Sequence, residues 1–477
     1  MAKKYNKKSL GVLISLLILF SAAIFVLPIK AKLKTSQAVN LKIIVTDQQA
    51  PGVIGVIDDF LASSLGDGVD DVTVVASGTR ADDQLTYLIS QMQIESEEFD
   101  VIGLDTIWPA QFAENGWIIE LGPLLDENEM NAYVPGMVDS CTYKGKIWAY
   151  PYFMNLGVLF YRNDILTRNG YSEDDIETWA ELKTVANAIL NDEDEQDLNP
   201  DLVGYVGQLD VYEGGVVNFF EWCGSFGATE IITSDGKVDI NNDDVNAAMT
   251  FIKGLIPPQY TGVMNNSYII PRSGLVHDEG SSVGVWLAGN AIFMRQWTFA
   301  YGLSVDEGMD FGVAPLPTAT GAADEKSSCV GGAVLSIPKY SKHKTEALNL
   351  IKFLGDKLAQ EFELTNISNF PALKSVYDSP PTGYEWIDEW KDQLAKTLSR
   401  PVHPDYSQVS TVIADYFSDL LSCQKDVDTA LEEMEADAKE ILGKEAPPPI
   451  PGFSVSLVIL SILSTIGIIF IIRRRNK

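Results

Sequence analysis

An alternation of strand and helix patterns over residues 41–105 constrains the fold more than any other feature of this sequence. The apolar run LKIIVTD begins at Leu41, and the apolar residues of the following GVIDDFLASSL recur about every 3.6 positions. The same order repeats in VDDVTVVASG, DDQLTYLISQMQ and a third apolar run from Val101 to Leu104. This βαβαβ order predicts an α/β fold with a parallel sheet covered by helices.

Asp105 directly follows the third predicted strand. In open α/β sheets, ligands bind beyond the carboxyl ends of the strands. The position of this carboxylate therefore makes it a candidate for ligand binding. The chain has 477 residues, which is enough for two or three domains of this kind.

The charge is distributed unevenly along the chain. Residues 1–34 and 473–477 hold 11 of the 35 Lys and Arg and no acid, so the middle carries 24 bases against 66 acids, a formal charge of −42. A body this acidic repels phosphate backbones, so we expect no nucleic acid partner.

Both ends of the chain are apolar. Four lysines precede the uncharged run Leu10–Pro28, so residues 1–34 are predicted to be a signal peptide or an N-terminal anchor. A Pro-rich linker, 442–452, leads to the uncharged run 453–472, predicted to be a transmembrane or sorting segment. The basic tail 473–477 should stay in the cytoplasm, which places the protein at the cell membrane with its body outside.

Motifs for metal, cofactor or nucleotide chemistry are missing from the sequence. The cysteines, Cys141, Cys223, Cys329 and Cys423, are too widely spaced for a metal site, and either disulfides or buried free thiols are compatible with them. The pattern G-x-x-x-x-G-K-[ST] does not occur, so the chain itself should not hydrolyse ATP. We expect no metal and no cofactor.

The stretch from Gly289 to Pro338 carries an aromatic cluster with polar neighbours. It reads GNAIFMRQWTFAYGL, then FGVAPLP, then CVGGAVLSIP, and it places Trp297, Phe299 and Tyr301 close together. It contains no good nucleophile or base. Aromatic rings offer flat apolar surface at low conformational cost, which suits a flat hydroxylated ligand that is held without being changed.

These three segments, in this order, resemble the extracellular solute-binding proteins of sugar ABC transporters (family 1), most closely the trehalose/maltose-binding type. Further matches are D-x-x-W from Asp105 to Trp108, E-T-W-x-E-L at Glu177–Leu182 and R-P-x-x-P-x-Y at Arg400–Tyr406. The resemblance covers residues 40–442. It implies a two-lobe periplasmic-binding-protein-like fold (type II), with three interlobe crossovers and the ligand in the cleft. Lobe 1 would be 39–149 plus 296–356, and lobe 2 would be 150–295 plus 357–441.

The resemblance also implies a set of ligand-binding residues. Asp105 should take two sugar hydroxyls, Trp297 and Phe299 should pack on the sugar, and Arg400 should close the site. The full set of candidates is Arg80, Asp105, Trp108, Phe153, Asn155, Tyr212, Glu213, Trp297, Phe299, Gly331, Gly332 and Arg400.

Three departures from this family bear on the ligand. Asn155 stands where the most similar type has Asp, Ala333 stands where it has a stacking Trp, and no Glu occurs near Gln49–Pro51. The chain thus lacks one stacking aromatic ring and up to two carboxylate charges of this type. We therefore expect a different or larger glycan rather than trehalose or maltose.

The expected function is therefore capture of a sugar or oligosaccharide by hinge closure, followed by delivery to ABC permease subunits in the membrane. Pro451-Gly452-Phe453, ahead of the apolar run and Arg tail, resembles the archaeal PGF-type C-terminal sorting signal. Two alternatives stay open. Residues 280–284 fit the G-x-S-x-G pattern of hydrolases, although they read as a loop before a strand, and abundant acids allow a membrane-anchored glycan hydrolase. A cell-surface adhesion protein without a closable cleft is the other.

Overall fold

The computed structural model describes residues 39–443, except 79, 193–197, 234, 259–267, 322–326 and 395. The predicted alternation is present at the start of the chain. It consists of β1 (Val39–Val45), α2 (Ala50–Ala62), β2 (Val69–Ala76), α3 (Ala81–Gln93) and β3 (Val101–Asp105). β1 lies between β2 and β3 and is parallel to both, which confirms the predicted parallel sheet.

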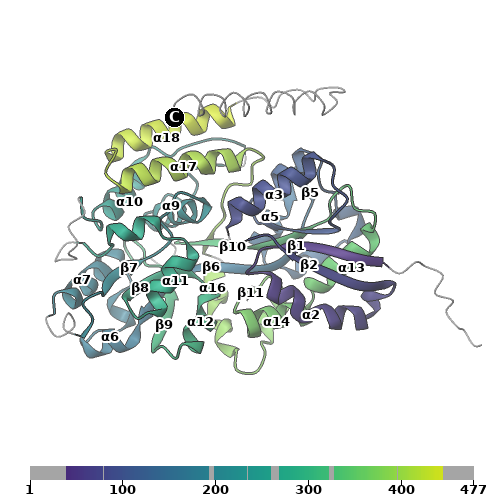
Figure 1. Ribbon diagram of the computed structural model, residues 1–477. Coiled ribbons are helices and arrows are strands. Elements are labelled where there is room, and N and C mark those ends of the chain that lie inside the picture. The colour runs from purple at the N-terminus through teal and green to yellow at the C-terminus, as the bar shows by residue number, and fades with distance from the viewer. Residues whose placement is uncertain are drawn as a thin grey trace, which may run out of the picture.

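The first helix shows how the sequence produces this layer. Pro51 occupies the first turn of α2, where its missing N–H costs nothing. Val53, Val56 and Phe60 then recur at helical spacing and are fully buried. They cover one face of the sheet, while α3 is drawn on the opposite side of β1 in Figure 1.

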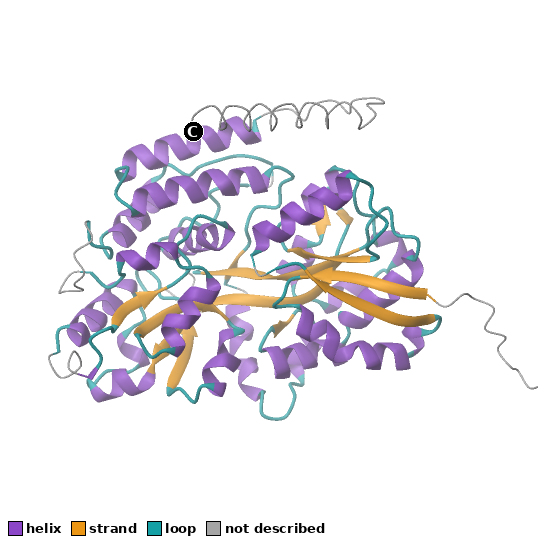
Figure 2. Ribbon diagram, in the orientation of Figure 1, coloured by secondary structure: helices purple, strands orange, loops and turns teal. Residues whose placement is uncertain are grey.

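One mixed sheet runs through the whole molecule in the order β2-β1-β3-β10-β6-β8-β7. Its later strands are β6 (Tyr150–Arg162), β7 (Val203–Val206), β8 (Ala291–Trp297) and β10 (Ser328–Ser336). The short strands β9 (Phe311–Pro315) and β11 (Phe370–Pro371) pair with β6, and β12 (Thr397–Leu398) pairs with β10. Figure 2 shows this sheet extending from one lobe into the other, with helices packed around each part.

Two groups of helices surround the two parts of the sheet, as Figure 1 shows. The first lobe holds, besides α2 and α3, the helices α4 (Pro109–Glu114), α5 (Pro135–Ser140), α13 (Lys344–Leu354), α14 (Lys357–Phe362) and α15 (Lys374–Asp378). The second lobe holds α6 (Asn163–Arg168), α7 (Trp179–Leu190), α9 (Glu213–Ser225), α10 (Asp243–Lys253), α11 (Glu279–Leu287), α12 (Ala300–Asp306), α17 (Tyr406–Leu421) and α18 (Val427–Leu442). Among the α-helices of the described residues, α16 (Lys391–Leu394) is the one left over, and it precedes β12.

The chain passes between the lobes three times, which agrees with the predicted number of crossovers. The long antiparallel strands β6 and β10 make two of these passages. The third leads from β11, which pairs with the start of β6, to α17, which packs on α9. The two-lobe α/β architecture inferred from the sequence is thus confirmed.

The predicted lobe boundaries differ from the structure in two segments. Residues 296–315 are predicted to lie in the first lobe, but Trp297 and β9 pair with residues 157–162 of β6 in the second. Residues 357–371 are predicted to lie in the second lobe, but α14 packs on α2 and β11 pairs with the start of β6. The lobe boundary lies where β6 changes its pairing partners. Because β6 continues unbroken through both lobes, the sequence pattern does not reveal this position.

The termini carry predictions that the structure does not address. The signal or anchor at 1–34, most of the linker at 442–452, the segment 453–472 and the tail 473–477 lie outside the described residues. None of the helices formed by the described residues combines the length and apolar composition needed to cross a membrane. Three cysteines are buried free thiols, and Cys423 is an exposed free thiol.

Candidate functional site

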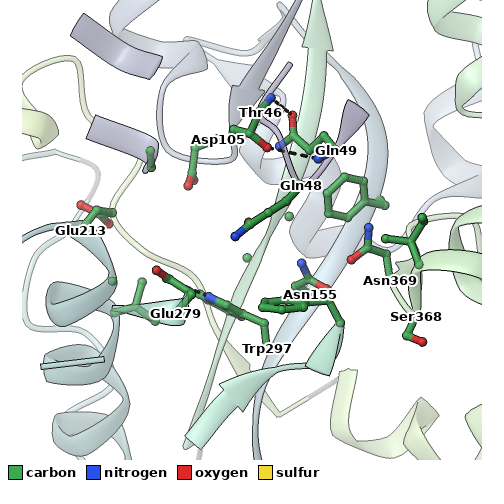
Figure 3. A pocket seen from close by; sticks show the side chains of 18 of the residues that line it. Thr46, Gln48, Gln49, Asp105, Asn155, Glu213, Glu279, Trp297, Ser368 and Asn369 are labelled. Carbon is green, nitrogen blue, oxygen red and sulfur yellow. Dashed lines mark hydrogen bonds between the residues drawn. The ribbon is translucent and has the colours of Figure 1, made fainter. Parts of the chain in front are cut away.

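A cavity of about 510 Å³ lies between the lobes. Its walls come from the end of β3, the middle of β6 and β10, the end of β8, and the first turns of α9 and α11. Figure 3 shows Asp105, Gln48 and Gln49 on one side, with Trp297 and Glu279 opposite them. Eleven of the twelve predicted binding residues line it: Asp105, Trp108, Phe153, Asn155, Tyr212, Glu213, Trp297, Phe299, Gly331, Gly332 and Arg400.

Arg400 joins the two lobes at one end of the cavity. Its Nη2 donates to Asp105 Oδ1 at 2.8 Å and to Thr106 Oγ1 at 3.0 Å, both in the first lobe. Its Nη1 donates to Glu213 Oε1 at 2.7 Å, at the start of α9 in the second lobe. The side chain is only 2% exposed, and its Nε has no partner among the described residues. Burial alone would lower the pKa of Arg400, but the two carboxylates raise it, so the guanidinium stays charged.

The two carboxylates on Arg400 differ in what they leave available. Asp105 Oδ1 accepts from Arg400, from the Thr106 hydroxyl at 3.1 Å and from the Ile107 N–H at 3.3 Å, while no described residue donates to Oδ2. Glu213 has both oxygens engaged, by Arg400, by the Tyr406 hydroxyl at 3.0 Å and by Ser410. Asp105 can therefore accept a ligand hydroxyl, whereas Glu213 chiefly fixes Arg400 in place.

Trp297 presents its indole ring to the cavity from the end of β8 (Figure 3). The guanidinium of buried Arg295 lies 4.1 Å from the ring centroid, and the indole N–H donates to Glu279 Oε1 at 3.3 Å. A Cβ on Gly331 would come within 2.7 Å of the ring, so glycine makes room for it. The ring is thus held on several sides while remaining part of the cavity wall.

Gly332 serves the backbone rather than the ring. Its φ of +120° lies in a region that favours glycine, and a Cβ would fall 2.3 Å from the Phe153 carbonyl oxygen. The register between β10 and β6 shifts at the next residues, Ala333 and Val334. The Gly-Gly pair therefore lets β10 run close to β6 where the sheet passes between the lobes.

Asn155 and Phe153 lie on β6 beside this pair. Asn155 Oδ1 accepts from the Thr298 hydroxyl at 2.8 Å, so its amide nitrogen is the group left for a ligand. Phe153 is buried and packs edge-on against Tyr152, with ring centroids 5.0 Å apart. Phe299, partly buried at the N-terminus of α12, adds a second aromatic surface from the second lobe.

Trp108, Tyr212 and Arg80 hold less direct positions. Trp108 is 2% exposed at the N-terminus of α4, so it is mainly a core side chain that reaches the cavity wall. Tyr212 donates to Glu279 Oε2 at 2.7 Å. Arg80 does not line the cavity. It pairs with Asp210 at 3.3 Å and lies over the Tyr212 ring, 4.6 Å from its centroid, so it links the lobes at the edge of the site.

Several lining residues were not predicted from the sequence. They include Glu279, Asp306, the first-lobe groups Thr46, Gln48, Gln49 and Gln84, and the segment 366–369, which spans the end of a π-helix (Glu363–Ile367). Thr46 and Gln49 follow β1 as Asp105 follows β3, so the rule about strand ends could have found them. Glu279 and the segment 366–369 give no such signal, because only the packing of the lobes brings them to the cleft.

The G-x-S-x-G pattern does not form a nucleophile elbow. Residues 280–284 lie inside α11 rather than in the loop that the sequence suggested. Ser282 is fully buried, and its hydroxyl donates to the Asp278 carbonyl oxygen at 2.7 Å and accepts from the Gln208 and Gln296 amides. A nucleophile elbow needs a strand, an exposed serine and then a helix, and this segment offers none of that arrangement.

Trp297 differs from Trp117, Trp148, Trp179 and Trp286, which do not line the cavity. Trp286 is fully buried, and Trp179 is 2% exposed and stacks on Trp222 with centroids 3.9 Å apart. Trp117 and Trp148 are partly buried against the core and do not line the cavity.

Two lobes, three crossovers and a polar, aromatic cavity between them define a binding protein that encloses a small solute. Comparison with known proteins agrees with this class. The chain belongs to the family of bacterial extracellular solute-binding proteins, whose pattern it matches over residues 56–393.

Individual relatives and structures sharpen the comparison. A probable ABC transporter-binding protein of Deinococcus radiodurans is 28% identical over 409 residues, covering 81% of this chain and 93% of the relative. Maltose-bound MalE3 of T. maritima is 27% identical with a TM-score of 0.74, covering 84% of this chain and 100% of that one. The acarbose-binding GacH receptor of Streptomyces glaucescens has a TM-score of 0.69 over 86% of this chain and 100% of its own, but at 19% identity it supports the fold alone.

Proposed function

We propose that this protein is the substrate-binding subunit of an ABC transporter and that it captures a sugar or oligosaccharide by closing its two lobes. The observation that carries the proposal is the cavity between the lobes, in which aromatic rings, carboxylates and amides from both lobes meet. Aromatic faces suit the C–H faces of a sugar ring, and carboxylate and amide groups suit its hydroxyls.

Closure follows from where these groups lie. A ligand that touches Asp105 in the first lobe and Trp297 in the second gains both contacts only when the lobes meet, so it stabilises the closed form. The hinge would lie in the three crossovers, where a few residues absorb the rotation. The Arg400 and Arg80 ion pairs that already span the lobes would assist closure.

The proposed ligand is a glycan other than maltose or trehalose. Asn155 offers an amide where the trehalose/maltose type has a carboxylate. Ala333 is buried between Asp105 and Phe153 of the neighbouring strands and provides no stacking platform. An arabinooligosaccharide-binding protein of Bacillus subtilis, 22% identical over 69% of this chain and 68% of its own, shows that other oligosaccharides occur among the relatives.

The proposal extends to the partner and the location. The closed protein would dock on permease subunits, and a separate ATPase would drive uptake. The uncharged run 453–472 with the basic residues after it supports a membrane anchor that leaves the body outside, and Pro451-Gly452-Phe453 supports its processing as a PGF-type signal. Mass spectrometry of the C-terminus from native membranes tests this directly, because an intact 453–477 segment rules out processing.

The binding step is tested with the full-length protein in detergent. Thermal shifts against a panel of mono- and oligosaccharides should identify at least one ligand, and small-angle scattering should then show a smaller radius of gyration. If only trehalose or maltose raises the melting temperature, the expected ligand class is wrong. If a sugar binds without compaction, the closure mechanism is wrong.

Trp297 provides the test of the site itself. Replacing it with alanine removes the aromatic wall and should weaken binding of the identified sugar at least about 30-fold, as for other buried aromatic anchors. Trp148→Ala is the matched control, because Trp148 is also partly buried but lies outside the cavity. Equal affinities of these two variants in calorimetry would show that the ligand binds elsewhere.

A further inference from the structure

The charges of the cavity wall do not balance. The ionisable residues that line it, apart from Tyr212, are Asp105, Glu213, Glu279, Asp306 and Arg400, four acids against one base. None of the described residues that line the cavity is a lysine. Arg400 already pairs with Asp105 and Glu213, so two carboxylates of the wall neutralise its charge.

Glu279 and Asp306 are therefore left without a cationic partner in the described part of the wall. Glu279 accepts hydrogen bonds from two neutral donors, the Tyr212 hydroxyl at 2.7 Å and the Trp297 indole N–H at 3.3 Å. Figure 3 shows its carboxylate pointing toward the cavity beside the Trp297 ring. Asp306 is exposed at the end of α12, at the cavity wall.

The residues around the cavity do not offset the negative charge of its wall. Arg295 lies behind the Trp297 ring, but Glu221 neutralises it through two hydrogen bonds of 2.6 and 2.7 Å. Near the edge of the site, Arg80 pairs with Asp210, and Asp82 and Asp278 lie within its electrostatic reach. The body as a whole carries 24 bases against 66 acids over residues 35–472, so it attracts cations and repels anions at long range.

We propose that the solute is an amine-bearing saccharide, with its ammonium group held between the Glu279 carboxylate and the Trp297 ring, and that the cavity rejects anionic saccharides. This inference rests on the proposed function. An aromatic face and a carboxylate together form a favourable site for an ammonium ion. Asp105 Oδ2, to which no described residue donates, and the Asn155 amide nitrogen remain for the hydroxyls.

The test compares disaccharides of equal size and linkage. Calorimetry on the full-length protein in detergent, at low salt and slightly acidic pH, uses β-1,4-linked diglucosamine, diacetylchitobiose, cellobiose and cellobiouronic acid. We expect diglucosamine to bind at least 10-fold more tightly than cellobiose, and cellobiouronic acid at least 10-fold more weakly. The preference for diglucosamine should disappear as the pH rises through the pKa of its amines.

Variants connect this preference to the named residues. The diglucosamine-to-cellobiose affinity ratio should fall about 10-fold in Glu279→Gln, which keeps the size and an acceptor oxygen, and about 3-fold in Asp306→Asn. Glu307→Gln is the matched control, because Glu307 is equally exposed next to Asp306 but does not line the cavity.

The outcomes separate the two proposals. The amine preference is overturned if the diglucosamine-to-cellobiose affinity ratio is near one in the unmodified protein, or if Glu279→Gln does not change that ratio. In either case, binding of a neutral sugar still supports the proposed function. If none of these saccharides nor any of the wider panel binds, the proposed function fails and the amine preference fails with it.

Discussion

Two buried arginines beside the cavity differ in where their carboxylate partners come from. Arg295 pairs with Glu221, and both belong to the second lobe. Arg400 pairs with Glu213 of the second lobe and Asp105 of the first. The first pair is the same whatever the positions of the lobes, whereas the Asp105 contact exists only when the lobes meet.

The donors that each arginine leaves unused differ as well. Arg295 engages Nε and Nη2 with Glu221 and Nη1 with Gln208 Oε1 at 2.7 Å. Arg400 engages both Nη atoms but leaves Nε without a partner among the described residues. An unpaired buried donor is costly, so the hydrogen bonding of Arg400 is less complete than that of Arg295. Arg295 therefore serves the fold, and Arg400 serves closure and binding.

The largest effect is expected from breaking the pair inside one lobe. Arg295→Leu leaves Glu221 as an uncompensated buried charge and should lower the free energy of unfolding by about 3–5 kcal/mol, measured by urea denaturation. The double variant with Glu221→Leu should recover much of that loss, because no buried charge remains. A loss below about 1 kcal/mol in the single variant would contradict the structural role of the pair.

Arg400 should respond differently. Arg400→Lys keeps a positive charge but cannot reach both carboxylates in the fixed fork of a guanidinium, so ligand affinity should fall about 100-fold, about 2.7 kcal/mol. Ligand-induced compaction should also be reduced in small-angle scattering. Arg272→Lys is the control, since Arg272 does not line the cavity and its acceptors among the described residues are the Pro257 and Ser422 carbonyl oxygens. If both variants bind equally well, Arg400 does not couple the lobes to the ligand.

The same contrast explains how much the sequence could predict. Periodicity over 41–105 predicts the first sheet layer because local patterns determine strands and helices there. The capping box of Thr178 and Glu181, which begins α7, is likewise a local pattern that is visible in the sequence. Asp105 could be predicted from its place after a strand, and Trp297 and Arg400 from family motifs that stand in order along the chain.

The remaining features depend on contacts distant in sequence. Glu279 reaches the cavity only because α11 packs beside β8, and no motif marks it. The lobe boundary depends on where the pairing partners change along β6, and the mostly apolar sequence of this strand does not encode that position. The roles of Glu213 and Arg295 as supports rather than ligand contacts follow from their hydrogen bonds, which only the folded chain shows.

A third buried charge site, with no arginine at all, extends the comparison. Glu363 is 1% exposed, and its carboxyl accepts from the Tyr152 hydroxyl and from the Asn369 amide at 2.8 Å. Gly52 of α2 packs so closely on it that a Cβ would lie 1.7 Å from Oε1. Burial raises the pKa of Glu363 from its ordinary 4.5 to about 7, because neither hydrogen bond offsets the cost of a buried charge without a cation.

The raised pKa of Glu363 predicts a pH-dependent change in stability that is smaller than the effects expected for Arg295 and Arg400. The folded state binds more protons than the unfolded state between about pH 4.5 and 7, so the unfolding free energy falls across that range and is level above it. At about 1.4 kcal/mol per pH unit the upper bound is about 3 kcal/mol, and relaxation around the charged carboxylate reduces it to about 2. Glu363→Gln should therefore be about 2 kcal/mol more stable than the parent at pH 8 and equal to it near pH 4. Glu361→Gln is the control, because Glu361 is a more exposed neighbour paired with Lys357, and it should show no such pH-dependent gain. If the unfolding free energies of Glu363→Gln and the parent run parallel at all pH values, the Glu363 carboxyl is already paired or solvated.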